Sequence, residues 1–344
     1  MRDATEPGQS AVKGARIIAT ASILGTGTSA ALTPVDSAAL DALHGFAPGH
    51  VARVTGVRQR PRADCDQITL AAEAGRAALA DAGVAADQLD AILHAAAVPY
   101  QTIPATAPLV QAALGLRDGQ VAAYDMGATC LGFLAALQHA AAMVETGRWQ
   151  RVLVVASEKV SPHLDWRDPA TAGLFGDGAG AAVVGAGAQG LRLGPITLQT
   201  HPSGYEAARL RAGGTRLGAE ATPADMRFAM DGPALFGLTR RRFDGFVQGC
   251  LAAAGLRIDQ IDLIVPHQAS PMALRMMARA MGVPAARLVD LSASHGNQVA
   301  ASLPVTLDHA RRSGRIRDGA RVLMLGTAAG VTFGAALLEA GSSG

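Results

Sequence analysis

The sequence predicts an α/β protein built from two similar halves. The first reason is an internal repeat, because segment 81–93, DAGVAADQLDAIL, resembles segment 253–265, AAGLRIDQIDLIV. The second is a later matching pair, RVLVV at 151–155 and RVLML at 321–325, whose members are separated by nearly the same length of chain. Order and spacing are both kept, which indicates a duplicated α/β unit.

Apolar segments alternate with helical ones along the first half. We expect strands at 17–24, 91–96, 121–125, 151–156 and 179–185, and helices at 67–82, 105–115 and 130–146. Short apolar strands between helices are typical of a sheet covered on both faces. We therefore predict two sheets packed across a shared helical layer. The halves are 1–187 and 188–344, divided in the glycine-rich segment 185–194.

The composition is typical of a compact globular chain, and it argues against nucleic acid and membranes as partners. Hydrophobic residues make up 49% and charged residues 17% of the 344 residues. The net charge of +2 and a longest basic run of three, Arg240 to Arg242, predict no nucleic-acid partner. We interpret that run as a solvated helix face, although it could contact an acidic partner. Without a secretory signal or a membrane-length apolar segment, we expect a soluble, cytoplasmic protein with no membrane contact.

Two glycine-rich motifs do not predict nucleotide binding. The run Gly25-Thr-Gly27 resembles a dinucleotide fingerprint, but Pro34 stands where the phosphate-binding helix would run. The glycines at 176–180 lead into a strand, so we expect a tight structural turn close to a site. The three cysteines are odd in number and widely spaced, which predicts neither a disulfide framework nor a metal site.

Cys130 is the cysteine best placed for chemistry. It follows the predicted strand 121–125 and begins the predicted helix 130–146. Unpaired N–H groups at a helix N-terminus favour an anion and can lower a thiol pKa from about 8.5 to roughly 3.5–7.5. The same N–H groups could hold a thioester oxyanion. Taken alone, a small buried hydrophobic role would be the better interpretation of any cysteine.

Motifs in the second half favour the catalytic interpretation. Strand 261–265 leads into Pro-His267-Gln-Ala, and a later loop reads Ser-His-Gly-Asn297-Gln-Val-Ala-Ala-Ser. Together with the Cys130 turn, FGDGAGA at 175–181 and GTAAGVTFG at 326–334, they follow the order found in β-ketoacyl-acyl carrier protein synthase III. The chain resembles that family from Ile17 to Leu338. The resemblance implies a thiolase-like fold, with duplicated α/β halves in a five-layered αβαβα arrangement.

The resemblance also implies the roles of the site residues. In the family the cysteine attacks an acyl thioester, while histidine and asparagine bind the carbonyl of a malonyl thioester as it loses carbon dioxide; these map onto Cys130, His267 and Asn297. The backbone N–H groups of Cys130 and Ala329 would form the oxyanion hole. Because decarboxylation itself creates the carbanion, hydrogen-bond donors are needed rather than a strong base. No cofactor is expected, since coenzyme A or acyl carrier protein thioesters are the substrates.

Related enzymes differ at identifiable positions. Thiolases use a second cysteine near the C-terminus, and none follows Cys250. Elongating synthases use a second histidine where Asn297 stands. In the family a tryptophan stacks on the adenine of coenzyme A, but this chain has His50 in the corresponding neighbourhood. Arg167 is only a candidate for the arginine that completes that stack. Either coenzyme A is held differently, or the primer arrives on a carrier protein or another thioester.

The resemblance implies partners as well. Ile103 matches a position that reaches across a homodimer into the acyl channel, and we place Phe236 in the same channel. Arg275 and Arg279, on the helix after His267, could meet an acidic carrier protein, although a solvated helix face is nearly as good an interpretation.

The leading functional hypothesis is a decarboxylating condensation of an acyl primer with a malonyl thioester through an acyl-Cys130 intermediate. The alternative is a cysteine-dependent acyltransferase of specialised metabolism without decarboxylation, which would have no need of Asn297. An inert partner of a heterodimer is disfavoured because Cys130 is present. The sequence leaves open the primer, its chain length, and whether the product belongs to fatty acid or to specialised, polyketide-type biosynthesis.

Overall fold

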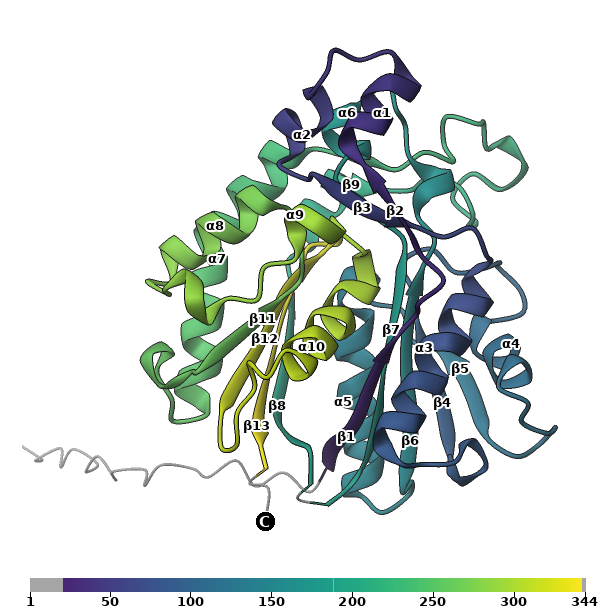
Figure 1. The fold of residues 1–344 in the computed structure, drawn as a ribbon, viewed down its shortest axis with the longest axis vertical. Helices are drawn as coiled ribbons and strands as arrows, with labels where there is room; N and C mark the ends of the chain where they lie inside the picture. Colours follow the sequence, from purple (N-terminus) through teal and green to yellow (C-terminus); the bar gives the residue numbers. More distant parts are fainter. Residues whose placement is uncertain (1–20, 188, 342–344) are drawn as a thin grey trace, which may run out of the picture.

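The computed structural model describes residues 21–187 and 189–341 (Figure 1). The predicted strand at 17–24 lies partly outside these residues. Nine strands form the main sheet, in the order β11-β12-β13-β8-β1-β7-β6-β4-β5. Their bounds are β1 (Ala21–Thr28), β4 (Ala91–Ala95), β5 (Ala122–Asp125), β6 (Arg151–Glu158), β7 (Gly178–Ala186), β8 (Leu191–Thr200), β11 (Leu263–Pro266), β12 (Arg321–Ala328) and β13 (Thr332–Ala340).

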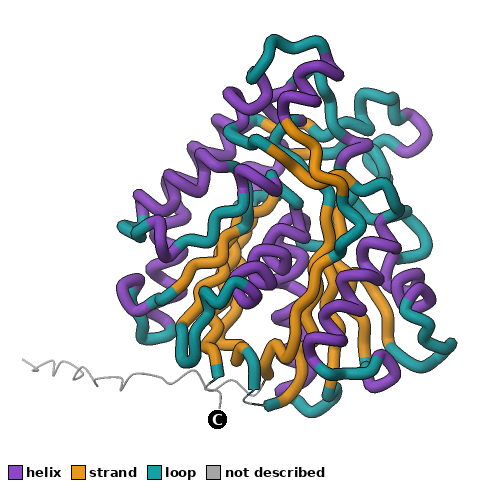
Figure 2. The backbone as a smooth tube through the Cα atoms, viewed as in Figure 1, coloured by secondary structure: helices purple, strands orange, loops and turns teal. Residues whose placement is uncertain are grey.

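The sheet consists of two wings that join at one corner. The first wing contains β1, β7, β6, β4 and β5, and the second contains β8, β13, β12 and β11. Strands β1 and β8 pair only at Ser22 with Arg192 and at Ile23 with Leu191. Beyond that corner the wings separate, and a helix lies between the two groups of strands (Figure 2). The two predicted sheets are therefore the two wings of one hydrogen-bonded sheet.

Helices complete five layers. They are α3 (Gln67–Ala82) and α4 (Thr106–Ala113) on the outer face of the first wing, α5 (Gly132–Glu145) and α10 (Ser302–Arg312) between the wings, and α7 (Gly232–Ala253) and α8 (Pro271–Ala280) on the outer face of the second wing. Alternation along β6 shows why both faces are covered, because Val152 and Val154 pack in the central core and Leu153 and Val155 pack in the outer one. The αβαβα prediction is confirmed.

The repeat extends through the structure. Helix α5 begins at Gly132 and α10 begins at Ser302, the same separation along the chain as between Arg151 and Arg321 of the repeated strands. Each of the two helices follows a single 3₁₀ turn. Those turns, Thr129–Leu131 and Val299–Ala301, each open with a non-glycine residue at positive φ, 47° at Thr129 and 52° at Val299. Both halves therefore carry the same unusual turn before the central helix.

Close packing explains the glycine motifs. A Cβ atom at Gly25 or Gly27 would overlap the backbone of α3 at Ala82 or Ala78, so these glycines let strand β1 lie directly against that helix. A Cβ at Gly178 would overlap the side chain of Gln298. The expectation of a turn at 176–180 is corrected here: β7 already begins at Gly178, and small residues are needed there for close contact with the second half.

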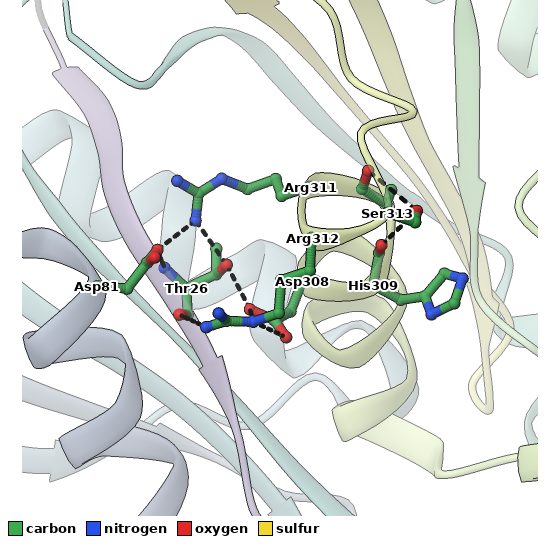
Figure 3. Close-up of polar contacts among 8 residues, drawn as sticks. Thr26, Asp81, Asp308, His309, Arg311, Arg312 and Ser313 are labelled. Atoms are coloured by element: carbon green, nitrogen blue, oxygen red, sulfur yellow. Dashed lines mark hydrogen bonds and ion pairs between the residues drawn. The ribbon is translucent and has the colours of Figure 1, made fainter.

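A polar network ties central helix α10 to the first half (Figure 3). Thr26 of β1 donates to Asp308 at 2.7 Å, and Arg312 donates to both oxygens of the same carboxylate. Arg311 donates to Thr26 at 2.7 Å and pairs with Asp81 of α3. The network fixes the position of α10 against β1 and α3.

The remaining elements gather at one end of the sheet, at the top of Figure 1. They include β2 (Thr33–Asp36), α1 (Ser37–His44), α2 (His50–Thr55), β3 (Gln59–Arg62), α6 (Pro169–Ala172), β9 (Ala208–Arg209), β10 (Ala229–Met230) and α9 (Ser292–His295). No helix in the described part of the chain is long and apolar enough to cross a membrane.

Candidate active site

The candidate site lies at the carboxyl ends of two parallel pairs of strands, one pair in each wing of the sheet. Cys130 comes shortly after β5, and Glu158 is the last residue of β6. His267 follows β11 directly, and Ala329 follows β12 directly. Carboxyl ends of parallel strands share one edge of a sheet, which is where α/β proteins bind ligands.

Cys130 and Ala329 are in contact. The Ala329 backbone N–H lies near enough to the Cys130 thiol to act to lower its pKa, and the Thr129 hydroxyl donates to the Ala329 carbonyl at 3.3 Å. Gly326 makes this approach possible, since a Cβ there would collide with Leu131 on one side and with His267 on the other. The predicted donor at Ala329 is thus beside the predicted nucleophile.

The expected activation of Cys130 is wrong for this state of the protein. Burial raises the pKa of the Cys130 thiol to about 12, and the nearby Glu158 carboxylate adds to the increase. Cys130 is partly exposed, but it packs against a cluster of buried apolar side chains that includes Val57 and Phe175. These side chains keep water away from the thiol. Desolvation and Glu158 therefore raise the pKa of this thiol more than the nearby Ala329 and Cys130 backbone groups lower it.

Asn297 is held in one orientation. Its Oδ1 accepts the Val299 N–H at 2.8 Å, and its backbone is fixed by bonds to Leu174 and Gly176. The amide nitrogen has one contact, with the Ala269 carbonyl at 3.5 Å, the limit of a hydrogen bond. Because Oδ1 is already occupied, the NH₂ group is the part of the side chain left to donate to a ligand.

His267 is buried and neutral. It is 4% exposed, and burial lowers its pKa to about 4. Its backbone is fixed by the Leu325 carbonyl at 2.7 Å, and its Nδ1 has no hydrogen-bond partner within residues 21–187 and 189–341. A neutral imidazole carries one ring N–H, so it can act as a donor without being charged.

The structure brings the halves together at these residues. The 3₁₀ turn that contains Cys130 contacts the equivalent turn at 299–301. Cys130 also packs in one apolar cluster with Val299, which lies close to Asn297 in the chain. The loops that carry Cys130 and Asn297 therefore lie against each other, and Gly326 brings the loops of His267 and Ala329 to the same place.

Other predicted site residues lie away from this centre. Ile103 is 85% exposed and Phe236 is 36% exposed. Arg275 and Arg279 lie exposed on α8, and neither pairs with an acidic residue in the described chain. Within one protomer, none of the four is brought against Cys130.

The donor end of the site differs from expectation. His50 contacts the Phe46 ring at 5.2 Å, and Arg167 is 82% exposed and paired with Asp165. The stacked pair is instead His44 and Trp166, with ring centroids 4.3 Å apart and planes 10° apart. Sequence reasoning missed Trp166, although a tryptophan in a polar loop was a usable signal.

Two buried polar groups near the site were also missed. Glu158 is fully buried, and burial raises its pKa to about 8. His94, also fully buried, accepts or donates a 2.8 Å bond with Ser157 and lies 3.5 Å from Asp125. Across the described residues, the His, Cys, Asp and Glu side chains form no group of three or more that could hold a metal.

Comparison with known proteins agrees with the motifs. Family models described as 3-oxoacyl-[acyl-carrier-protein] synthase III and as its C-terminal part match residues 124–202 and 251–340. The β-ketoacyl-[acyl-carrier-protein] synthase III of Bordetella petrii is 43% identical over 82% of this chain and 85% of its own. A Streptomyces coelicolor synthase III is 38% identical over 83% of this chain and 86% of its own.

Solved structures agree with this result. The 3-oxoacyl-(acyl carrier protein) synthase III, FabH, of Pseudomonas aeruginosa is 32% identical, with a TM-score of 0.84, covering 94% of this chain and 99% of that one. The Thermus thermophilus FabH is 34% identical at the same TM-score, covering 94% and 100%. This chain therefore belongs to the β-ketoacyl-acyl carrier protein synthase III family of thiolase-fold acyltransferases.

Proposed function

We propose that the chain condenses an acyl primer with a malonyl thioester, with loss of carbon dioxide, through an acyl group carried on Cys130. The observation that carries this proposal is that two uncharged donors, the Asn297 NH₂ and the neutral His267 ring, come from loops that lie next to the cysteine turn. Such donors suit an enolate oxygen that forms in the transition state. The donor thioester is of the coenzyme A or carrier-protein type, and no cofactor takes part.

In the first half-reaction the Cys130 sulfur bonds to the primer carbonyl carbon. The backbone N–H groups of Cys130 and Ala329 would stabilise the oxyanion, and the bond to the departing thiol then breaks. Because burial raises the pKa of Cys130 to about 12, the thiol proton must leave during the attack. That proton ends on the departing thiolate, which leaves as a free thiol.

In the second half-reaction the malonyl carbonyl oxygen would lie between His267 and Asn297. The bond to the carboxylate breaks, carbon dioxide leaves, and the electron pair forms an enolate that both side chains stabilise. The enolate carbon then attacks the acyl-Cys130 carbonyl, and the bond from that carbonyl to sulfur breaks. The Cys130 thiolate then takes up one proton from water, which restores the resting thiol.

We propose that the duplicated halves, 1–187 and 188–344, divide this chemistry. The first half carries the nucleophile, and the second carries the two enolate donors. The matching 3₁₀ turns before α5 and α10, one in each half, support this division. A cytoplasmic location stays a prediction.

We also propose that the protein is a homodimer. Strand β5 is the edge of the nine-stranded sheet, with unpaired backbone groups on one side. The nearby Ile103 and Tyr100 are 85% and 45% exposed, which suits contact with a second copy and with its acyl channel. Light scattering of the purified protein tests this, and a monomer at micromolar concentration would contradict it.

We propose that acyl carrier protein docks on α8. Arg275 and Arg279 are exposed and unpaired within the described chain, and Met272 beside them is 63% exposed. A charged rim beside apolar area suits an acidic partner helix. Replacing both arginines with glutamate should raise KM for malonyl-carrier protein while loading from a small thioester continues. Equal effects on both substrates would contradict this surface.

Condensation is tested with purified protein, a panel of acyl thioesters and a malonyl thioester. Intact mass should show the acyl adduct on Cys130, and carbon dioxide should appear together with a 3-oxoacyl product. Transfer of the acyl group to an alcohol or amine without carbon dioxide would favour the acyltransferase alternative.

A further inference from the structure

The duplicated turn in the second half has no nucleophile. Ala300 is the counterpart of Cys130 in the repeat, since each is the middle residue of the 3₁₀ turn that precedes a central helix. The backbone N–H of Ala300 faces the Glu158 carboxylate, with 3.3 Å between nitrogen and Oε1. In the second half, the N–H group at the position equivalent to Cys130 therefore donates to Glu158, an acidic side chain of the first half.

Glu158 is held by backbone groups alone. Its Oε1 also accepts the Ala97 N–H at 2.6 Å, and its Oε2 accepts the Val98 N–H at 3.4 Å. The side chain is fully buried, and no basic side chain of the described residues pairs with it. Burial raises the pKa of Glu158 to about 8, so near neutral pH the side chain is mainly a protonated acid whose oxygens still accept these N–H groups. The proposed reaction gives it no chemical role.

The turn that Glu158 holds is the turn that orients Asn297. Two consecutive N–H groups point in different directions, since Val299 N–H donates to Asn297 Oδ1 at 2.8 Å and Ala300 N–H donates to Glu158. Val299 has a φ of 52°, a conformation that β-branched residues rarely adopt. Such backbone persists only where surrounding contacts hold it in place.

We propose that Glu158 is a positioning residue: it fixes the Val299–Ala300 turn and thereby aims the Asn297 amide at the malonyl carbonyl. The inference rests on the proposed function of Asn297 in decarboxylation. Through this contact the end of β6 in the first half sets the geometry of a donor in the second half.

The sequence offers a direct probe of this geometry. Asn297 is the only asparagine among the 344 residues. Protein made with asparagine labelled by ¹⁵N in the side-chain amide therefore gives one NH₂ signal pair. Its chemical shift reports the environment of Asn297 whether or not the enzyme turns over.

The test compares Glu158→Ala, Glu158→Gln and a control, Asp308→Ala, which removes a buried carboxylate in α10 that bonds to Thr26 and not to the Asn297 turn, and which adds no second asparagine. In Glu158→Ala the NH₂ signals should move or broaden, and carbon dioxide release should fall by up to about 10²-fold, as expected when a reacting group is displaced by about 1 Å. Primer loading on Cys130 should stay within about threefold, because Glu158 can only raise the pKa of the Cys130 thiol, so its removal does not hinder the attack.

Glu158→Gln should show the same pattern with a smaller change. Its amide oxygen can still accept from Ala97 and Ala300, while its NH₂ group cannot accept from Val98. If Glu158→Ala does not fold, the ratio of decarboxylation to loading in Glu158→Gln decides, compared with the same ratio in Asp308→Ala. A ratio equal to that of the control, with unmoved NH₂ signals, would overturn the proposal.

Asn297→Ala separates this inference from the proposed function. If that variant keeps full decarboxylation, the role of Asn297 is wrong and the proposed function fails with it. If Asn297→Ala loses decarboxylation while both Glu158 variants keep it, only the positioning role of Glu158 is overturned.

Discussion

Asn297→Ala tests the division of labour between the two half-reactions. The substitution removes the one side-chain amide whose Oδ1 is fixed by Val299 N–H and whose NH₂ remains available. Loss of one such donor to a developing oxyanion costs about 10²–10³ in rate, or roughly 2.7–4 kcal/mol. Decarboxylation should fall by that factor. Loading of Cys130 should continue, because it uses the N–H groups of Cys130 and Ala329.

The same substitution leaves the buried Val299 N–H without an acceptor, which should cost about 1–3 kcal/mol of stability. Asn297→Asp is the matched control, since it keeps an acceptor oxygen for Val299 but presents no NH₂ group. It should keep more stability than Asn297→Ala and still lose decarboxylation. Single-turnover mass spectrometry measures loading, and carbon dioxide release measures the second step. Equal loss of both steps, or of neither, would refute this reasoning.

Three further predictions follow from the structure. Cys130→Ala should fold and form no acyl adduct, and an adduct formed at the wild-type rate would identify another nucleophile. Because burial raises the pKa of Cys130 to about 12, its alkylation rate should climb about tenfold per pH unit from pH 7 to 10; a plateau below pH 8 would reveal an activated thiolate. Gly27→Ala should cost about 1–3 kcal/mol in denaturant unfolding because its Cβ meets the α3 backbone, whereas the open Gly249→Ala should not destabilise, and equal effects would contradict the packing argument.

Much of the fold was predictable because the sequence contains the same α/β unit twice. The repeated segments predicted two equivalent wings, and the alternation of apolar strands with helices placed α3, α4 and α5 within a few residues of their observed bounds. The joining of the wings was not predictable. It depends on two residue pairs between β1 and β8, and such a register is a tertiary property with no signal in either strand.

The site was predictable as residue types but not in its electrostatics. Motif order predicted Cys130, His267 and Asn297 as site residues, and their loops are neighbours in the structure, while their catalytic roles stay predictions. The sign of the Cys130 pKa shift was wrong, because sequence shows a helix start but not the depth of burial that opposes it. Glu158 escaped notice because its partners, Ala97 and Ala300, lie far from it in the chain, on either side.

The central claim is that carbon–carbon bond formation on acyl-Cys130 is coupled to decarboxylation. The most direct measurement loads the protein with one acyl equivalent, adds a malonyl thioester, and counts carbon dioxide and 3-oxoacyl product in a single turnover. We predict one carbon dioxide and one 3-oxoacyl thioester for each acyl group lost from Cys130. Discharge of the acyl group without carbon dioxide, or carbon dioxide release with the acyl group still on Cys130, would contradict the claim.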